Sequence, residues 1–355
     1  MGLPGYRQDT PETALPQRQR AGIHWATPRT AGPREAQPRK EVEIMRVAEY
    51  DRYGPPDVIH LVTVREPDPP GPGEVMVQVI AAGLNPADTK MRRGQTPITD
   101  LPARIGREFS GVVIEVGPGV DHVSAGDEVL GTGQGVMADI VVVPAELVMA
   151  KPDGITLDQA AVLPVAAQTA WAAVESQNVQ RGEVVVVSAA AGGVGVVMCQ
   201  LLRDKGASVI ATASNHNHEY LEALGVFPVD YHGDLVTTLR EMTPKGLHHV
   251  FDNSGHETIE AALELGVPRD YINSISGDGP KYAVPTVGRT GLDPEAIRAL
   301  AEKIADGSLV IPIVVLPFDE IRKAYIDLEE RRTFGKNVVR MDNIPERDMP
   351  DFPPA

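Results

Sequence analysis

Two patterns of hydrophobic positions divide the chain. From residue 45 to about residue 152, short apolar runs such as EVMVQVIAAGL, SGVVIEVGPGV and DEVLGTGQGVMADIVVVP are separated by glycine and proline. Runs of this length and punctuation are typical of strands joined by tight turns. The first pattern therefore predicts a β-rich domain, which we expect to be a partly closed barrel.

The period changes at about Thr156, where LDQAAVLPVAAQTAWAAVES places apolar residues at helical spacing. The segments VVVVSAAAGGVGVVMCQLLRDKGASVIATAS, YLEALGVFPVD, LVTTLREMTPKGLHHVFDNSG and IEAALELGVPRDYINSISG then alternate helices with short apolar strands. This alternation predicts βαβ units and a parallel sheet. After Gly307 the pattern returns to strand, helix and strand. The helix, at about 319–331, carries EE beside RR and is expected to be a solvated surface helix.

Composition narrows the class of protein. A length of 355 residues suggests two domains, and aromatic residues are only 5% of the chain, so Val, Ala, Leu and Ile must form most of the core. The net charge of −16 argues against a nucleic-acid partner, and no stretch of 18 apolar residues predicts a membrane span. Cys199 is the only cysteine, which excludes an intrachain disulfide and a cysteine-based zinc lobe. It falls within an apolar run and is expected to be buried.

The two ends of the chain differ from the rest. Residues 1–44 are rich in proline and poor in apolar residues, which predicts a disordered leader. They hold no apolar segment typical of a secretory signal peptide, so we expect a cytoplasmic protein. Residues 342–355 also hold four prolines and are expected to form a loose tail.

A glycine-rich turn follows the run VVVV and precedes a helix. Ala190, Gly192 and Gly195 stand at the spacing of G-x-G-x-x-G, with alanine in the first position. In a βαβ unit this pattern gives a tight turn, a close approach of the backbone to a pyrophosphate, and close helix–strand packing. The turn therefore predicts a dinucleotide site, which also includes Gly193 and Val194.

The second strand of this unit indicates which dinucleotide binds. An NAD site usually has an acidic residue about 20 residues after the glycines, which binds the ribose 2′-hydroxyl. Here the strand ends at Ser214 and Asn215, and no acidic residue occurs before Glu219. Ser214, Asn215 and His218 can donate hydrogen bonds to a 2′-phosphate, so the sequence favours NADP.

Five separated motifs carry a family resemblance. AAGLNPADTKMRRG, GREFSGVVIEVG, GDEVLG, LPVAAQTAWAAV and AAAGGVG occur in one order between about residues 45 and 341. In these motifs the chain resembles the zinc-independent quinone oxidoreductases of the medium-chain dehydrogenase/reductase superfamily. The resemblance implies an α/β fold: a GroES-like β-barrel domain formed by 45–165 and 308–341, and a Rossmann domain with a doubly wound parallel sheet formed by 166–307.

The same resemblance bears on metal binding. Zinc-dependent relatives carry a cysteine near the start of the NPAD segment and a His-Glu pair before the glycine-rich strand. This chain has Gly83-Leu84-Asn85 and Arg107-Glu108 there, so no metal site is expected. Without a metal to polarise a carbonyl, alcohol oxidation is difficult. Hydride addition to a quinone or a conjugated C=C is easier, because the acceptor delocalises the charge.

The resemblance also implies roles for individual residues. Asn85 corresponds to an asparagine that faces the nicotinamide and substrate, and Asp88 to an aspartate of the same loop. Lys90 stands where many relatives have tyrosine, which leaves the proton donor open: this lysine is a candidate, but a surface lysine without a catalytic role is the favoured interpretation. The remaining positions are a threonine near the nicotinamide, an aromatic residue near the 2′-phosphate, and strand ends that contact the ribose and carboxamide: Thr169, Tyr231, Asn253, Ser254, Ile275 and Ser276.

These observations support an NADPH-dependent, metal-independent reductase of quinones or α,β-unsaturated carbonyls. An enoyl-thioester or dedicated alkene reductase of a biosynthetic pathway, and an NADPH-binding module without turnover, are the alternatives. The expected partner is a small molecule. The apolar stretch 271–275 and KYAVPTVG at 281–288 also predict a homodimer that pairs at the edge of the Rossmann sheet.

Overall fold

The structure is a computed structural model that describes residues 44–96, 100–288, 291–331 and 334–342. All of these belong to one compact unit, residues 42–355. The predicted leader (1–44) and tail (342–355) lie, except for residues 44 and 342, outside the described residues.

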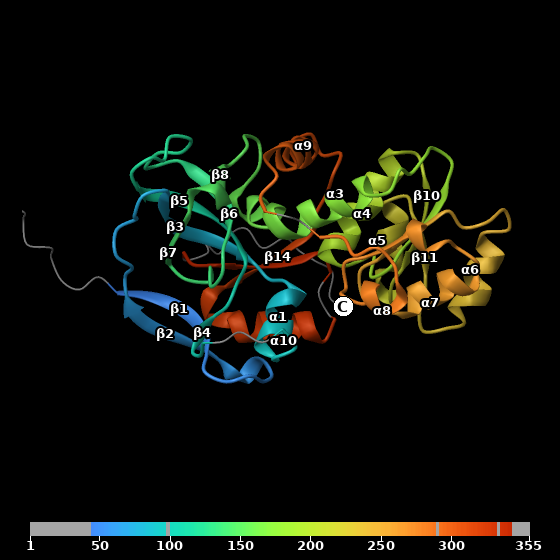
Figure 1. Cartoon of the computed structure of the whole chain (residues 1–355), viewed down its shortest axis with the longest axis horizontal. Helices are drawn as coiled ribbons and strands as arrows, with labels where there is room; N and C mark the ends of the chain where they lie inside the picture. Colours follow the sequence, from blue (N-terminus) through green and yellow to red (C-terminus); the bar gives the residue numbers. More distant parts are fainter. Residues whose placement is uncertain (1–43, 97–99, 289–290, 332–333, 343–355) are drawn as a thin grey trace, which may run out of the picture. The chain divides into compact units, whose positions relative to one another are not determined.

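Two sheets form the β-rich part of the molecule (Figure 1). In the smaller sheet the strand order is β2-β1-β4, and in the larger it is β14-β15-β3-β5-β6-β8, with β7 also paired to β3. The strands are β1 (Ile44–Tyr50), β2 (Ile59–Arg65), β3 (Glu74–Gly83), β4 (Ala103–Arg104), β5 (Glu108–Val116), β6 (Glu128–Thr132), β7 (Ile140–Pro144), β8 (Val148–Ala150), β14 (Ile313–Pro317) and β15 (Lys336–Arg340).

The larger sheet joins segments from both ends of the described chain. Strand β15 pairs antiparallel with the end of β3, in the register Val338 opposite Gly83, and parallel with β14. Alternate residues of β3, including Val75, Val77 and Val79, are buried in the core that the sheet encloses. The return to strand character after Gly307 is therefore explained by a sheet that needs β14 and β15 to cover the edge of β3.

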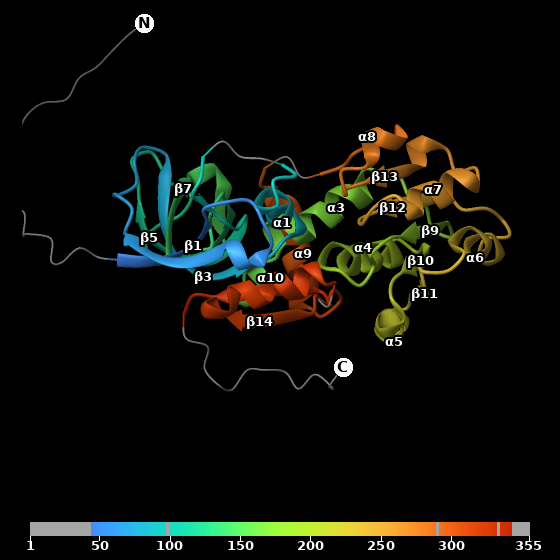
Figure 2. The same ribbon diagram turned by 90° about the horizontal axis from the view of Figure 1, so that it is seen from below.

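The second part is a parallel sheet with the strand order β11-β10-β9-β12-β13. Its strands are β9 (Val184–Val187), β10 (Ser208–Thr212), β11 (Phe227–Val229), β12 (His249–Asp252) and β13 (Ile272–Ser274). Figure 2 shows helices on both faces. Residues of α3, α4 and α9 pack on one face, and those of α6 and α7 pack on the other.

The helices follow the predicted alternation. They are α1 (Pro86–Arg92), α2 (Leu157–Ala160), α3 (Gln168–Glu175), α4 (Gly193–Asp204), α5 (His218–Ala223), α6 (Leu235–Met242), α7 (Glu257–Glu264), α8 (Gly279–Tyr282), α9 (Pro294–Ala305) and α10 (Ile321–Glu329). One π-helical turn, η3 (Leu163–Ala167), precedes α3. Short 3₁₀ turns are η1 (Pro56–Val58), η2 (Ala145–Leu147), η4 (Asn215–Asn217), η5 (Arg269–Tyr271) and η6 (Phe318–Glu320).

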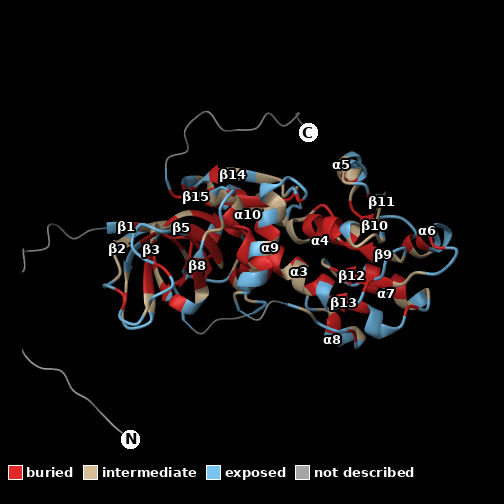
Figure 3. Ribbon diagram, turned by 90° about the horizontal axis from the view of Figure 1, so that it is seen from above, coloured by how far each residue is buried: buried red, intermediate tan, exposed pale blue. Residues whose placement is uncertain are grey.

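The predicted fold class is confirmed: an antiparallel β domain is combined with a Rossmann-type parallel sheet. The predicted domain boundaries at 165, 307 and 341 remain a prediction. The expectation for the helix near 319–331 was incomplete. Ile321, Ala324 and Tyr325 of α10 are buried, and only its other face meets solvent (Figure 3). The expectation rested on the EE and RR residues and did not consider the apolar stripe, at ordinary helical spacing, on the opposite face of the helix.

Candidate active site

The glycine-rich turn connects β9 to the N-terminus of α4. Ala189 has a φ of 46°, so the left-handed residue of this turn precedes the predicted first position, Ala190. Gly195 packs against the strand, since a Cβ there would lie 2.7 Å from the Cα of Ala190. A Cβ on Gly192 would meet only the carbonyl oxygen of Ala189, at 3.4 Å. The chain itself therefore does not require glycine at position 192, whereas a pyrophosphate on the helix N-terminus would.

The carboxyl ends of β9, β12 and β13 are tied together by Asp252, the last residue of β12. Its buried carboxylate accepts hydrogen bonds from Ser188 Oγ at 3.0 Å, Ser274 Oγ at 2.7 Å and Ser276 Oγ at 2.8 Å. The side chain of Asn253 donates to the carbonyl oxygen of Ser188 at 2.8 Å, while its buried Oδ1 has no partner among the described residues. This network fixes the sheet edge at which parallel α/β sheets bind ligands.

Four residues predicted to lie near a 2′-phosphate follow β10 and β11. The hydroxyl groups of Ser214 and Tyr231 are 3.4 Å apart. The Nε2 atom of His218 is 3.2 Å from the carbonyl oxygen of Ala213, and Asn215 is exposed at the start of η4. With the open turn at Gly192, these residues fit a nicotinamide dinucleotide, which supplies a hydride when bound.

A buried ion pair lies beside this turn. The Lys336 ammonium is 2.8 Å from Glu108 Oε1, and the two side chains are 5% and 0% exposed. It also donates to the carbonyl oxygen of Leu84 at 2.5 Å and to Asn85 Oδ1 at 2.9 Å. All three ammonium protons thus have an acceptor. The stem of Lys336 covers the Cα of Gly193, where a Cβ would lie 2.6 Å from its Cγ.

The other carboxylate oxygen of Glu108 anchors the π-helical turn. Oε2 accepts the backbone N–H of Val165 at 2.8 Å and, more weakly, that of Ala166 at 3.4 Å. A π-turn carries backbone N–H groups that lack the usual helical acceptors, and the carboxylate satisfies two of them. Glu108 therefore connects β5 to the segment that leads into α3.

Asn85 is the residue that this ion pair positions most directly. It is 5% exposed; its Nδ2 donates to Glu108 Oε1 at 2.9 Å and to the Gly83 carbonyl at 3.4 Å, while its Oδ1 accepts from Lys336. Both polar groups of this amide are therefore occupied inside the protein. Its predicted catalytic role remains a prediction, and its structural role is to hold the start of α1.

Asp88 lies one helical turn further along α1 and is 2% exposed. Its Oδ2 accepts the backbone N–H of Asn85 at 2.9 Å and the hydroxyl of Tyr325 at 3.1 Å. Loss of solvation raises the pKa of Asp88 to about 6, although these two hydrogen bonds and the charges of Lys336 and Arg107 oppose the rise. Asp88 thus joins α1 to α10.

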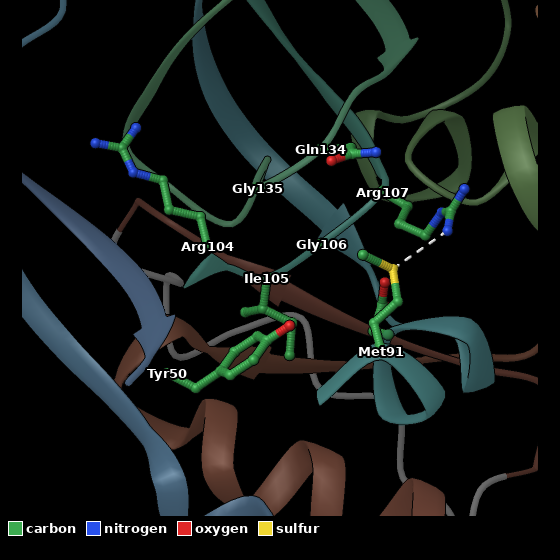
Figure 4. A pocket seen from close by; sticks show the side chains of 9 residues that line it. Tyr50, Met91, Arg104, Ile105, Gly106, Arg107, Gln134 and Gly135 are labelled. Carbon is green, nitrogen blue, oxygen red and sulfur yellow. Dashed lines mark hydrogen bonds between the residues drawn. The ribbon is translucent and has the colours of Figure 1, made fainter. Parts of the chain in front are cut away.

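A small pocket opens beside Asp88, lined also by Tyr50, Met91, Arg107 and Gln134 (Figure 4). Arg107 Nη1 contacts Met91 Sδ at 3.4 Å, as the dashed line shows. The Tyr50 hydroxyl and Asp88 Oδ1 are buried without a partner among the described residues. Polar atoms in such positions are commonly satisfied by ordered water.

Two further predicted residues lie on α1 and α3. Lys90 is half-buried, and its Nζ donates to the carbonyl oxygen of Ser276 at 2.5 Å. Ile275 is fixed by its N–H, which donates to the carbonyl oxygen of Asp252 at 2.9 Å. Thr169 is partly exposed in the first turn of α3. Lys90 therefore connects α1 to the strand end at which the carboxamide contact is predicted.

Four residues of this arrangement were not predicted as site residues: Glu108, Lys336, Tyr325 and Asp252. Two of them carried a usable signal, because Glu108 and Lys336 are charged residues that open apolar strands. A charge in such a position has to be paired when it is buried. The sequence does not indicate which charge pairs with which.

No group of three or more His, Cys, Asp or Glu residues within the described ranges is arranged to hold a metal ion. Arg107 and the occupied amide of Asn85 stand at the positions where zinc-dependent relatives are expected to have ligands. Cys199 is buried, and its burial raises the pKa of the thiol to about 12. In the part of the chain that the structure describes, no helix combines the length and apolar character needed to cross a membrane.

Comparisons with known proteins agree with this geometry. Residues 71–153 match the alcohol dehydrogenase GroES-like domain, and residues 193–274 match the zinc-binding dehydrogenase family. The chain is 31% identical over 319 residues to the quinone oxidoreductase of Pseudomonas aeruginosa, covering 82% of this chain and 98% of that protein. It is 31% identical over 315 residues to the chloroplastic NADPH-dependent alkenal/one oxidoreductase of Arabidopsis thaliana, covering 83% and 79%.

Among solved structures, the Escherichia coli quinone oxidoreductase complexed with NADPH superposes with a TM-score of 0.74 at 26% identity, covering 83% of this chain and 99% of that one. Other relatives are longer: the chain spans 8% of a polyketide synthase component from Streptomyces venezuelae and 60% of a synaptic vesicle membrane protein homolog from Rattus norvegicus. The chain belongs to the medium-chain dehydrogenase/reductase superfamily of oxidoreductases. Within it, the chain is a member of the quinone oxidoreductase-like family.

The two glycines of the turn give a matched pair of variants. Gly195→Ala should lower the free energy of unfolding by about 1–3 kcal/mol or more, because its Cβ would overlap the backbone of Ala190. Gly192→Ala should melt like the wild type but bind the nicotinamide dinucleotide more weakly, because its Cβ projects toward the phosphates. Thermal melting and fluorescence titration of the cofactor measure the two effects. If Gly192→Ala bound the dinucleotide as tightly as the wild type, the pyrophosphate would not lie close to the backbone at Gly192.

Asp88→Asn should stabilise the protein above pH 7. The folded state raises the pKa of Asp88 from 3.8 to about 6, so the folded protein holds an extra proton between these pH values and loses stability as the pH rises through them. Above pH 7 this pKa rise lowers the free energy of unfolding by ~3 kcal/mol. The neutral amide of asparagine avoids this cost and can still accept a hydrogen bond from the Asn85 N–H. Denaturation of both proteins from pH 4 to 8 measures this contribution.

The control for this experiment is Asp121→Asn, since Asp121 is exposed on a turn. Its stability difference from the wild type should stay nearly constant across the same pH range. If the wild type instead gained stability relative to Asp88→Asn as the pH rose, the neighbours of Asp88 would be holding it as a carboxylate.

Proposed function

We propose that this protein is an NADPH-dependent, metal-independent reductase that transfers hydride to a quinone or to the C=C of an α,β-unsaturated carbonyl. The observation that carries the proposal is the open turn at Gly192, next to which Lys336 of β15 binds Glu108 and Asn85. A dinucleotide on this turn would bring a hydride donor to the side of the turn that the barrel segments cover.

The preference for NADPH is supported by the residues after β10. Ser214 and Tyr231 present hydroxyl groups 3.4 Å apart, and Asn215 and His218 follow on the same turn. A carboxylate in this place would repel a 2′-phosphate, whereas hydroxyl and amide groups donate to it. A relative named for NADPH dependence and a structural neighbour complexed with NADPH support the same preference.

Metal independence is supported by the chemistry of the donor groups. The guanidinium of Arg107 cannot ligate a cation, and Asn85 Oδ1 already accepts a hydrogen bond from the Lys336 ammonium. The acceptor must then stabilise most of the developing charge by its own conjugation. Quinones and enones do this, whereas a simple ketone does not. Thr169 remains a proposed catalytic residue near the nicotinamide, whereas Asn85 and Asp88 are proposed to support catalysis by fixing the position of α1.

The test is oxidation of NADPH, followed by absorbance, with benzoquinone, an unsaturated ketone and an enoyl-CoA as acceptors. We expect turnover with the first two, lower affinity for NADH than for NADPH at fixed salt, and no loss of activity after treatment with a chelator. Turnover of enoyl-CoA alone would assign the protein to thioester reduction. Tight NADPH binding without turnover of any acceptor would make it a binding module.

We also propose that the protein forms a homodimer at the edge of the parallel sheet. In the described chain, the outer side of β13 is bonded to the segment 285–287: the Ser274 N–H donates to the Pro285 carbonyl at 2.9 Å, and the Val287 N–H to the Ser274 carbonyl at 3.0 Å. Thr286, between them, turns its own N–H and carbonyl outward and is exposed. This backbone edge offers hydrogen bonds to a second copy.

Light scattering should therefore give twice the 38.1 kDa chain mass at micromolar concentration. Thr286→Pro removes an outward N–H without breaking a bond to β13, so it should shift the equilibrium toward the monomer without lowering the melting temperature of the monomer. Thr286→Ser is the matched control, because it keeps the backbone N–H, and it should remain dimeric. A wild type of monomer mass would refute the proposal.

A further inference from the structure

A reductase of this kind has to stabilise the anion that hydride addition creates and then protonate it. Asn85 is badly placed to do either, because Glu108, Lys336 and the Gly83 carbonyl already occupy its amide. Using it would break hydrogen bonds inside a buried network, at the cost of leaving polar groups unpaired. Another donor on α1 is therefore needed.

Of the two cationic side chains of α1, Lys90 is the one without a carboxylate partner among the described residues: Arg92 pairs with Glu329, and the nearby Thr89 hydroxyl is fully buried. Its Nζ reaches from the barrel part of the chain to the carbonyl oxygen of Ser276, 2.5 Å away, just after β13. No carboxylate of the described residues forms an ion pair with it, in a chain of net charge −16. One of its three N–H groups is used, and the other two are available to a ligand.

The contact with Ser276 places this ammonium at the ligand-binding edge of the parallel sheet. Asp252 holds the Ser276 side chain at 2.8 Å, and Ser274 Oγ accepts the Ser276 N–H at 3.2 Å, so the carbonyl that Lys90 meets is fixed. Lysine is a compact charge on a flexible stem with three rotatable donors. The Lys90 ammonium can therefore leave the neutral Ser276 carbonyl and bind an anionic oxygen of the acceptor without breaking an ion pair.

We propose that Lys90 is the catalytic residue that stabilises the anion formed on the acceptor and donates the proton that completes the reduction. This inference rests on the proposed reductase function.

The reaction balances with one hydride and one proton. A nicotinamide cofactor held by the Gly192 turn would supply the hydride, which carries two electrons and forms the C–H bond at the β-carbon of an unsaturated ketone. The electrons of the C=C bond move toward the carbonyl oxygen, next to the Lys90 ammonium. An N–H bond of Lys90 then breaks and its proton goes to the α-carbon. The half-buried amine takes a proton back from water.

Lys90→Met tests the proposal by comparing two acceptors. Protonation of the α-carbon of an enolate requires a general acid. Reduction of an unsaturated ketone by Lys90→Met should therefore be slower than by the wild type by about 100-fold or more. The hydroquinone anion formed from benzoquinone is a weak base that water protonates, so the benzoquinone rate should lose only the charge stabilisation and fall far less than the rate with the unsaturated ketone. A merely structural role for Lys90 would lower both rates together.

Two further variants separate charge from proton transfer. Lys90→Arg keeps the positive charge but is not deprotonated, so it should recover acceptor affinity without restoring the rate on the unsaturated ketone. Lys245→Met is the matched control, because Lys245 is an exposed lysine on the loop after α6. It should leave both rates unchanged. Thermal melting of each variant confirms that it folds.

A second measurement does not need turnover. Acetylation of lysines by acetic anhydride, quantified by mass spectrometry, should be slower at Lys90 when NADPH is bound and unchanged at Lys245. If the wild type reduced no acceptor, the proposed function would fail, and protection of Lys90 would still test its place in the site. Equal loss of both rates in Lys90→Met, unchanged rates, or labelling of Lys90 that NADPH does not alter would overturn the proposal.

Discussion

The ion pair between Lys336 and Glu108 is the interaction on which the rest of the site depends. Two charges removed from water are stabilising only when every lone pair and proton finds a partner. Here the carboxylate and the ammonium are both saturated by backbone and amide groups. Removing either partner of such a pair typically costs about 3–5 kcal/mol, because the other charge is left buried and alone.

This pair also determines the geometry of the segments around it. Glu108 begins β5 and holds the π-turn before α3, while Lys336 begins β15 and covers Gly193 at the N-terminus of α4. The same ammonium fixes Asn85 at the start of α1, the helix that carries Asp88 and Lys90. Five segments are thus held together by two side chains, so a small movement at any one of them would be resisted by all the others.

The sequence predicted the parts of the molecule that are governed by local spacing. The glycine turn, the βαβ alternation and the residues after β10 follow from positions close together in the chain. The partners of Asn85 do not, because Glu108 and Lys336 are 23 and 251 residues away and either charge could have remained at the surface. The burial of Tyr325 does not follow from local spacing either. The charged face of α10 predicts a surface helix, and the contact of Tyr325 with Asp88 joins residues far apart in the chain.

The place of Lys336 in the chain has a consequence for biosynthesis. Lys336 follows Glu108 by 228 residues, which a ribosome adds in roughly 10 to 50 seconds, and during this time Glu108 lacks its Lys336 partner. The end of β3 meanwhile lacks β15 and presents an open strand edge, a feature that favours association with other chains. The barrel and the start of α1 therefore reach their final form after the parallel sheet has been synthesised. The candidate active site can therefore be complete only after translation has passed residue 336.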